Sequence, residues 1–292
     1  MPHPHTRDTI FVEDAAVLQH QALAAGQYLL RLAAPATAER ALPGSFIHLR
    51  CHEDLPMRRP MSIMRADPGA GWIDILYKVH GQGTDKLARA GNGDTVNLLG
   101  PIGNPFKLRG YRNIPLLIGG GVGIPPMVFL AEHMLKQAGT VTPFAVLGSE
   151  IPFPFNPRPS GIMVDGIPDA AIACMPLLED WGIASRLTSR QGYAGCYDGF
   201  VTDLARHWLS GLDQEQRQQV EIFSCGPTPM LRAVAALAAE FSLPCQVSLE
   251  EYMACAVGGC AGCTVPVYKN GAASMQRVCV DGPVFQADEV FP

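Results

Sequence analysis

The chain has 292 residues and a formal net charge of −5, which indicates a globular protein of two domains with room for several cofactors. The acidic balance, without any run of basic residues, argues against a surface that binds nucleic-acid phosphates. Residues 1–12 lack the basic start and apolar stretch of an export signal, so we expect a cytoplasmic protein. The uncharged run at 114–131 contains glycines and prolines that would break a spanning helix, so no membrane association is predicted.

The first part of the chain alternates short apolar segments with turn residues. Segments at 28–32, 46–49 and 72–77 have the length and spacing of strands, and a Pro-Gly turn separates the first two. Short strands at this spacing are typical of an antiparallel barrel or sandwich. We therefore predict one all-strand domain over residues 1–110.

From residue 111 the pattern changes to apolar strand, turn and helix. Strands are predicted at 115–118, 144–147, 184–188 and 220–224, and helices at 127–137 (closed by Gly139), 177–181, 200–209 and 229–240. Alternating strands and helices predict an α/β domain with a parallel sheet over residues 111–240. Residues 241–292 are read as a loop-rich segment. The proline-rich loop at 151–160 has no role that the sequence identifies.

Four of the nine cysteines fall within 25 residues, in the spacing Cys255-x4-Cys260-x2-Cys263-x15-Cys279. This spacing is close to that of plant-type 2Fe-2S clusters. Glycines at 258, 259 and 262 suit a loop that folds tightly around a cluster, with backbone N–H groups toward its sulfur atoms and positive φ angles. The alternative is a structural zinc site, which usually presents two C-x-x-C knuckles, whereas this segment has one.

Two glycine-containing loops each join a buried strand to a helix. The first includes Gly121, Val122 and Gly123 and precedes Pro125, and the second includes Cys225, Gly226 and Pro227. Such turns expose backbone donors to a phosphate-bearing ligand. The first is not the G-x-G-x-x-G fingerprint, and either alone could be simple strand-to-helix geometry. Two of them on one parallel sheet predict a ligand crevice.

A third group of residues lies in the all-strand domain. It comprises Arg59, Pro60, Met61 and Ser62, followed by Leu76, Tyr77, Lys78, Gly83 and Thr84. An arginine can hold a pyrophosphate with two hydrogen bonds, and a nearby hydroxyl or backbone N–H can bind a flavin ring nitrogen. Without other context, these residues would read as ordinary strand ends at the surface.

These motifs, in this order and with the sequence Gly-Pro-Ile-Gly-Asn-Pro-Phe at 100–106, resemble the ferredoxin-NADP reductase superfamily. The cysteine cluster after the nucleotide domain is similar to one branch, the electron-transfer subunits of type B dihydroorotate dehydrogenase. The resemblance extends from the Pro-Gly-Ser-Phe turn at 43–46 to Asp-Gly-Pro-Val-Phe at 281–285.

The resemblance implies an FAD-binding β-barrel domain at 1–110, an NAD(P)-binding α/β domain at 111–240 and a 2Fe-2S segment at 241–292. It implies that Arg59, Pro60, Met61, Ser62, Leu76, Tyr77, Lys78, Gly83 and Thr84 hold FAD. The nucleotide, NAD(H) or NADP(H), would lie across Gly121, Val122, Gly123, Cys225, Gly226 and Pro227, and the cluster would be held by Cys255, Cys260, Cys263 and Cys279.

One departure concerns the choice of nucleotide. Ser189 and Arg190 follow the strand at 184–188, where related subunits often have an acidic pair. These two residues resemble the 2′-phosphate contacts of NADPH-using reductases, since an arginine suits a phosphate and an acid suits a ribose hydroxyl. NAD remains the expected nucleotide, and NADP the alternative.

The resemblance also implies a partner. An FMN-containing catalytic subunit would oxidise dihydroorotate to orotate in pyrimidine biosynthesis, within a heterotetramer, and electrons would reach NAD through 2Fe-2S and FAD. No general acid or base is assigned to this chain. The alternatives are a reductase component of another oxidoreductase or oxygenase, and a non-enzymatic redox sensor. Because the short 2Fe-2S segment can hardly shield a cluster alone, we expect it to pack on the nucleotide domain and face a partner.

Overall fold

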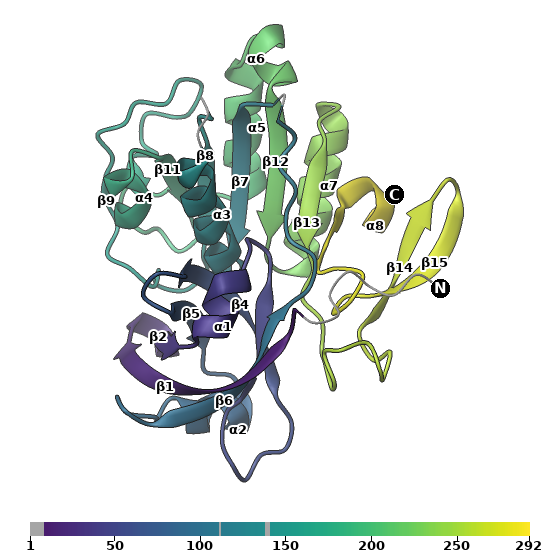
Figure 1. The fold of residues 1–292 in the computed structure, drawn as a ribbon. Coiled ribbons are helices and arrows are strands. Elements are labelled where there is room, and N and C mark those ends of the chain that lie inside the picture. Colours follow the sequence, from purple (N-terminus) through teal and green to yellow (C-terminus); the bar gives the residue numbers. More distant parts are fainter. Residues whose placement is uncertain (1–8, 111, 138–140) are drawn as a thin grey trace. The chain divides into compact units, whose positions relative to one another are not determined.

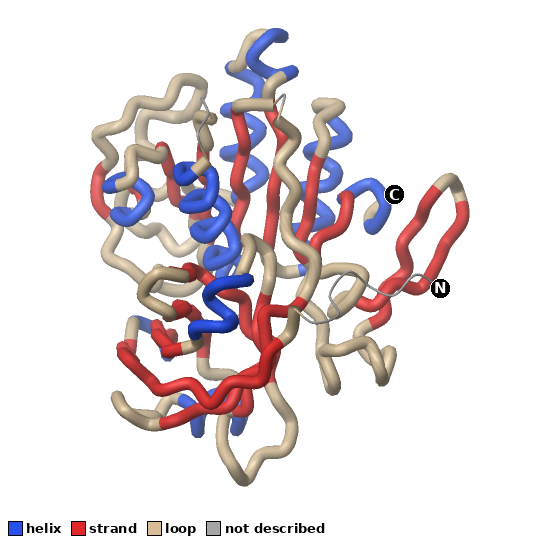
Figure 2. The backbone as a smooth tube through the Cα atoms, in the orientation of Figure 1, coloured by secondary structure: helices blue, strands red, loops and turns tan. Residues whose placement is uncertain are grey.

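A computed structural model describes residues 9–110, 112–137 and 141–292. The chain divides into two compact units (Figure 1). The first ends at Phe106 and also takes in Leu249–Val284, and the second comprises Lys107–Ser248 and Phe285–Pro292. Figure 2 shows that strands dominate the first unit, whereas helices and strands alternate in the second.

The first unit contains a closed six-stranded antiparallel barrel of order β1-β2-β5-β4-β3-β6. Its strands are β1 (Phe11–Ala22), β2 (Gln27–Ala33), β3 (Phe46–Arg50), β4 (Arg59–Asp67), β5 (Trp72–Lys78) and β6 (Thr95–Ile102). Short helices η1 (Ala24–Gly26), α1 (Pro35–Arg40) and α2 (Gly81–Leu87) join them. Ile47 and Leu49 of β3 and Ile63 of β4 are fully buried and fill the barrel core.

The cysteine segment, Leu249–Val284, belongs to the same compact unit as the barrel. The sequence instead predicts that it packs on the nucleotide domain. The segment contains the hairpin β14 (Thr264–Lys269) and β15 (Ala272–Arg277). The side-chain amide of Asn104, just after β6, donates to the carbonyl oxygens of Val280 (3.1 Å) and Asp281 (2.9 Å). The main chain of Asn104 also donates to Gly282, at 2.6 Å. These bonds fix the segment to the barrel, and they join residues too distant in sequence for local patterns to reveal.

The second unit is built on a six-stranded sheet of order β11-β8-β7-β12-β13-β16. The strands are β7 (Ile114–Gly120), β8 (Phe144–Gly148), β11 (Ala184–Thr188), β12 (Val220–Cys225), β13 (Cys245–Ser248) and β16 (Val284–Gln286), with a small pair β9 (Arg158–Pro159) and β10 (Ala173–Cys174) beside it. The helical segments are η2 (Gly121–Gly123), α3 (Ile124–Lys136), α4 (Pro176–Asp180), α5 (Val201–Gly211), α6 (Gln214–Gln218), α7 (Thr228–Glu240) and α8 (Ala287–Val290). Helix α3 covers one face, and α5 and α7 cover the other (Figure 1).

Strands β11, β8, β7, β12 and β13 run parallel. Their order reverses between β7 and β12, since the chain moves outward from β7 to β8 and later returns to the other side of β7. In open α/β sheets this reversal opens a ligand crevice at the carboxyl ends of the strands. The predicted strands and helices of this unit agree with the structure to within a few residues. The predicted helix end at Gly139 lies outside the described residues.

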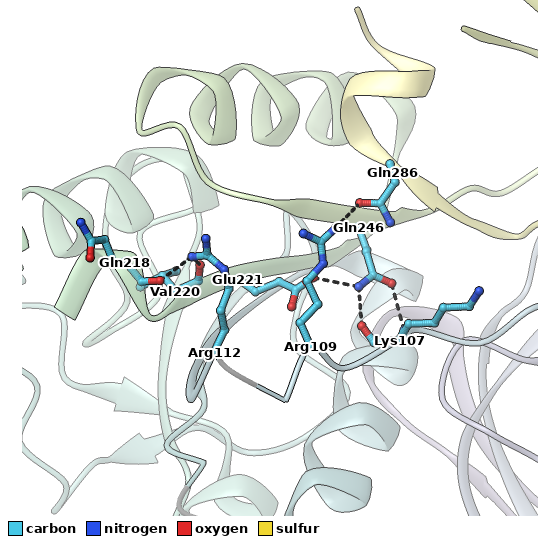
Figure 3. Close-up of polar contacts among 8 residues, drawn as sticks. All are labelled: Lys107, Arg109, Arg112, Gln218, Val220, Glu221, Gln246 and Gln286. Atoms are coloured by element: carbon cyan, nitrogen blue, oxygen red, sulfur yellow. Dashed lines mark hydrogen bonds and ion pairs between the residues drawn. The ribbon is translucent and has the colours of Figure 1, made fainter. Parts of the chain in front are cut away.

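Residues 241–292 are only partly loop-rich, because β13 extends the parallel sheet and β16 adds the strand beyond it. A network of polar side chains connects β12, β13 and the segment that precedes β7 (Figure 3). Glu221 accepts from Gln246 at 2.9 Å and pairs with Arg109 at 3.3 Å. Gln246 also holds both the main-chain N–H and the carbonyl of Lys107, at 3.0 and 2.6 Å. The first residues of the second unit are therefore anchored to its sheet.

None of the helices that the structure describes is both long and apolar enough to span a bilayer.

Candidate functional site

Two of the motifs predicted to bind FAD meet on the barrel. Arg59 begins β4 and Gly83 lies in α2, and a β-carbon on residue 83 would stand 3.2 Å from Nε of Arg59. Glycine thus leaves room for the guanidinium beside the helix backbone. The hydroxyl of Thr84 accepts from the main-chain N–H of His80 at 2.6 Å, which orders the start of α2. An arginine beside the first turn of a helix is suited to a pyrophosphate, since the guanidinium and the main-chain N–H groups can bind the same anion.

Some other residues of the predicted FAD site have side chains that pack within the barrel unit. The side chain of Met61 is buried, and Pro60 and Ser62 on either side are half-buried, as strand alternation requires. Tyr77 stacks on Tyr28 with ring centroids 5.4 Å apart, and its hydroxyl lies 3.0 Å from Nε2 of His20. Met61 and Tyr77 can therefore offer a ligand their main chain, whereas the half-buried Ser62 can offer its hydroxyl.

The next residues of β5 complete this region. Leu76 is buried and Lys78 is exposed, and both flank Tyr77 on the strand. Strand β5 pairs with β4 and β2. The structure therefore brings the β4 and β5 motifs onto adjacent strands.

The two glycine loops of the second unit interlock at the carboxyl edge of the sheet. They follow the adjacent parallel strands β7 and β12. A β-carbon on Gly123 would overlap the carbonyl group of Cys225, and one on Gly120 would overlap the sulfur of Met230. Val122 at the tip is exposed, whereas Cys225 is buried. The loops therefore form one surface of closely spaced main chain, bounded by the N-termini of α3 and α7, which is suited to a dinucleotide pyrophosphate.

Ser189 and Arg190 follow β11 at the same edge of the sheet. Ser189 is buried, and its hydroxyl accepts from the main-chain N–H of Gln191 at 3.2 Å. Arg190 is exposed, with its guanidinium 5.2 Å from the ring centroid of Phe200. Glu150, which sequence reasoning missed, is close by, since its carboxylate accepts from the side chain of Gln191 at 3.1 Å. A cation and an anion thus both border the expected ribose position.

The loop at 151–160 lies beside this position. Phe153 is buried and contacts Phe155, with ring centroids 5.3 Å apart, and the edge of Tyr193 at 6.2 Å. Ser149, just after β8, donates to the carbonyl of Ile151 at 2.7 Å. The loop therefore packs against the segment that follows Arg190.

The four cysteines of the C-terminal segment are arranged as two pairs. The thiol of Cys255 lies within hydrogen-bonding reach of Cys260, and that of Cys279 within reach of Cys263. In the parts of the chain that the structure describes, no three acidic, histidine or cysteine side chains gather around one metal-sized position. Two thiol pairs suit a 2Fe-2S cluster, in which each iron takes two thiolates.

Main-chain N–H groups of the loop point at these sulfur atoms. The N–H of Cys260 lies 3.4 Å from Sγ of Cys255, and that of Gly262 lies 3.4 Å from Sγ of Cys260. Positive φ angles produce this geometry at Ala256 (57°), Gly258 (79°) and Ala261 (52°). Of the three glycines expected to need such angles, only Gly258 has one, since two alanines take the other positions. The loop therefore fits a cluster whose sulfur atoms accept hydrogen bonds.

The pKa values of Cys255 and Cys279, one cysteine from each pair, are shifted in opposite directions. Burial raises the pKa of Cys255, but hydrogen bonds from the N–H groups of Val257, Cys260 and Gly259 and from the Cys260 side chain together outweigh burial, and the net pKa is about 7. Burial and the neighbouring Cys263 thiol raise the pKa of Cys279 to about 12. The local environment therefore favours the thiolate at Cys255 and the protonated thiol at Cys279.

His48 of β3 is a buried residue near this segment that sequence reasoning did not find. Its side chain is 1% exposed, and neither ring nitrogen makes a hydrogen bond of normal geometry within the described chain. Burial lowers its pKa to about 4, and the charge of Arg58 contributes to the lowering, while backbone groups of Met253 and Arg58 nearby oppose it. No sequence pattern distinguishes such a histidine from an ordinary strand residue.

The fold and these sites define a two-domain reductase of the ferredoxin-NADP reductase type with an iron-sulfur loop. A solved structure of an NADH-dependent reduced ferredoxin-NADP oxidoreductase, studied for flavin-based electron bifurcation, has a TM-score of 0.76 and 27% identity, over 95% of this chain and 90% of that one. The ferredoxin reductase of carbazole 1,9a-dioxygenase shares the fold at a TM-score of 0.62 and 21% identity, over 80% of this chain and 67% of that one.

Residues 250–291 match the family model of the iron-sulfur cluster binding domain of dihydroorotate dehydrogenase B. The electron transfer subunit of dihydroorotate dehydrogenase B (NAD(+)) from Desulforamulus reducens is 32% identical over 96% of this chain and 98% of that protein. The subunit of the same name from Listeria innocua is 34% identical over 94% and 96%. The chain therefore belongs to the family of dihydroorotate dehydrogenase B electron transfer subunits. The expected fold class and resemblance are confirmed.

Proposed function

We propose that this chain transfers electrons between NAD and a partner subunit that oxidises dihydroorotate to orotate, using FAD and a 2Fe-2S cluster. The observation that carries the proposal is the paired arrangement of Cys255, Cys260, Cys263 and Cys279 under main-chain N–H groups. This loop belongs to the same compact unit as the barrel. Family membership supports the assignment, since the relatives are named electron transfer subunits.

The cofactors divide the chemistry between them. A nicotinamide exchanges two electrons as a hydride, a 2Fe-2S cluster exchanges one electron, and a flavin can do both. The chain's own residues bind and orient these groups. FAD is held by Arg59, Ser62, Gly83 and the main chain of Met61 and Tyr77. Loops 119–123 and 225–227 hold the nucleotide pyrophosphate, and the four cysteines hold the iron.

The partner is expected to approach the cysteine loop. Tyr252 is 93% exposed and Val257 is 52% exposed, on either side of Cys255. Exposed apolar side chains next to an electron outlet are typical of a protein contact. We propose an FMN-containing catalytic subunit as the partner, in a heterotetramer, with both chains in the cytoplasm.

We propose NAD as the nucleotide. Glu150 accepts a hydrogen bond from Gln191, the residue after Arg190, where we expect the ribose of the nucleotide, and an acid there suits a hydroxyl and repels a 2′-phosphate. Arg190 acts in the opposite sense, but its guanidinium lies over the ring of Phe200. The names of the relatives, which specify NAD, support this choice.

The test is coexpression with an FMN-containing dihydroorotate dehydrogenase subunit under anaerobic conditions. The purified complex should reduce NAD with dihydroorotate, whereas neither subunit alone should do so. Cys263→Ser should abolish the transfer, and Cys196→Ser, a cysteine outside the loop, should leave it intact. Rapid NAD reduction by the Cys263→Ser complex would contradict the proposal.

A second candidate is a reductase that serves another acceptor. The 27% identity to the NADH-dependent reduced ferredoxin-NADP oxidoreductase, over 95% of this chain, favours it. NADH-dependent reduction of a ferredoxin by the isolated chain, without stable binding to the FMN subunit, would select this function. A redox sensor would show neither activity.

A further inference from the structure

Arg277 lies over the cysteine loop and is not a ligand in the proposed function. It ends β15, two residues before Cys279. Its Nη1 donates to the carbonyl of Gly258 at 3.2 Å. The side chain of Arg277 is 39% exposed, so its guanidinium reaches from the surface onto the loop.

Gly258 connects this arginine to a cluster ligand. Its main-chain N–H points toward the thiol of Cys279, while its carbonyl accepts from Arg277. The φ angle of Gly258 is 79°, and a β-carbon there would lie 2.5 Å from the side chain of Val280. The arginine therefore holds the residue whose N–H faces the cysteine.

Arg277 is itself fixed by an acid. The carboxylate of Asp281 accepts from the main-chain N–H of Arg277 at 2.8 Å and pairs with its Nε at 3.4 Å. The carbonyl of Asp281 accepts in turn from the amide of Asn104 on the barrel, at 2.9 Å. A continuous set of contacts thus runs from the barrel through Asp281 and Arg277 to the loop.

We propose that Arg277 and Asp281 form an opposed pair of charges that positions the cysteine loop and sets the reduction potential of its cluster, with Arg277 raising the potential and Asp281 lowering it. The inference rests on the proposed function, because it requires that the four cysteines hold a 2Fe-2S cluster.

The physical reason is the change of charge on reduction. A cluster that accepts one electron from the flavin gains one negative charge and no proton is required. A nearby guanidinium stabilises that added charge, and a nearby carboxylate opposes it. Because both side chains lie at the edge of the loop, solvent screens them only in part. If Arg277 only held the loop in place through its hydrogen bond to Gly258, the reduction potential would not depend on the sign of the charge that is removed at position 277 or 281.

The experiment is a redox titration of the full chain with its cofactors, followed by electron paramagnetic resonance of the reduced cluster. We expect Arg277→Gln to lower the midpoint potential, with a reduced-to-oxidised ratio about tenfold lower at a given poise, or about 59 mV. Asp281→Asn should raise the potential. Arg277→Lys should stay close to wild type, as should Arg40→Gln, which removes an exposed charge from α1.

Opposite shifts in the Gln and Asn variants would support the inference. Shifts in the same direction, or none in either variant, would overturn it, because bracing alone cannot produce opposite signs. If Arg277→Gln retains no cluster, the raised potential of Asp281→Asn and the unchanged potential of Arg277→Lys carry the test. A wild-type chain without a reducible cluster would overturn the proposed function as well, whereas a titratable cluster with unchanged potentials would overturn this inference alone.

Discussion

Gly123 lies directly against the main chain of Cys225, so the two glycine-containing loops of the nucleotide unit form a single surface. The contact joins the ends of β7 and β12, the two strands between which the order of the sheet reverses. Two weak sequence motifs thereby become one site, because the missing side chain of Gly123 lets the main chains of the two loops approach each other closely.

Gly123→Ala should disrupt the nucleotide site. The added methyl group overlaps backbone, which cannot rotate away, so the loops must separate. We expect NADH binding to weaken by more than about tenfold and stability to fall by roughly 1 to 3 kcal/mol. Titration of NADH binding and a urea unfolding curve measure both. Gly110→Ala is the control, since a β-carbon at residue 110 would meet no atom of the described chain within 4 Å, and equal losses in both variants would contradict the prediction.

Nucleotide choice should depend on Glu150. Replacing it by Gln removes the charge that repels a 2′-phosphate but keeps an oxygen that can accept from Gln191. We expect kcat/KM for NADPH relative to NADH to rise about three- to tenfold in Glu150→Gln. Arg190→Gln should move the ratio the other way. Equal changes with both nucleotides would show that Glu150 has no part in selecting between them.

Gln246→Ala tests the network of polar side chains shown in Figure 3. The change leaves the main chain of Lys107 without its partner and removes one hydrogen bond from Glu221, a buried carboxyl whose pKa is raised by burial. A loss of about 2 to 4 kcal/mol in the free energy of unfolding is expected. Denaturant unfolding checks this against Gln218→Ala, an exposed position. A loss no larger than that of Gln218→Ala would be inconsistent with the network's role.

His48 predicts a dependence of stability on pH. Its folded pKa of about 4 lies below the usual value of 6.5, so the folded state favours the neutral ring. The corresponding stability is complete above about pH 6.5 and is lost as the pH falls toward 4, by up to roughly 3 kcal/mol. His48→Leu should therefore unfold with a shallower pH dependence between those values. The exposed His207 provides the control, and a His48→Leu slope equal to wild type would refute the assignment.

Local sequence patterns predict most of the secondary structure of the nucleotide unit and the position of the cysteine loop. The strands and helices of the nucleotide unit follow from apolar runs bounded by glycine and proline, and the cysteine spacing predicts a four-thiol loop. The pairing of thiols and the interlocking of the glycine loops needed the structure, since both depend on how residues far apart in sequence approach each other.

Other features could not be predicted because their causes are long-range or specific to the backbone. The cysteine segment belongs to the barrel unit because Asn104 bonds to carbonyls at 280 and 281. Positive φ angles at Ala256 and Ala261 break the rule that glycine marks such positions. The burial of His48 and the approach of Glu150 to Gln191 leave no trace in the local sequence.

Electron transfer from NADH through FAD to the 2Fe-2S cluster is tested most directly by an anaerobic titration of the isolated chain with NADH, followed by visible absorption and electron paramagnetic resonance. We predict bleaching of a flavin band, together with a paramagnetic signal from a reduced 2Fe-2S cluster that Cys263→Ser destroys or alters and Cys196→Ser preserves. A colourless protein that holds stoichiometric zinc at the four cysteines, and does not respond to NADH, would contradict it.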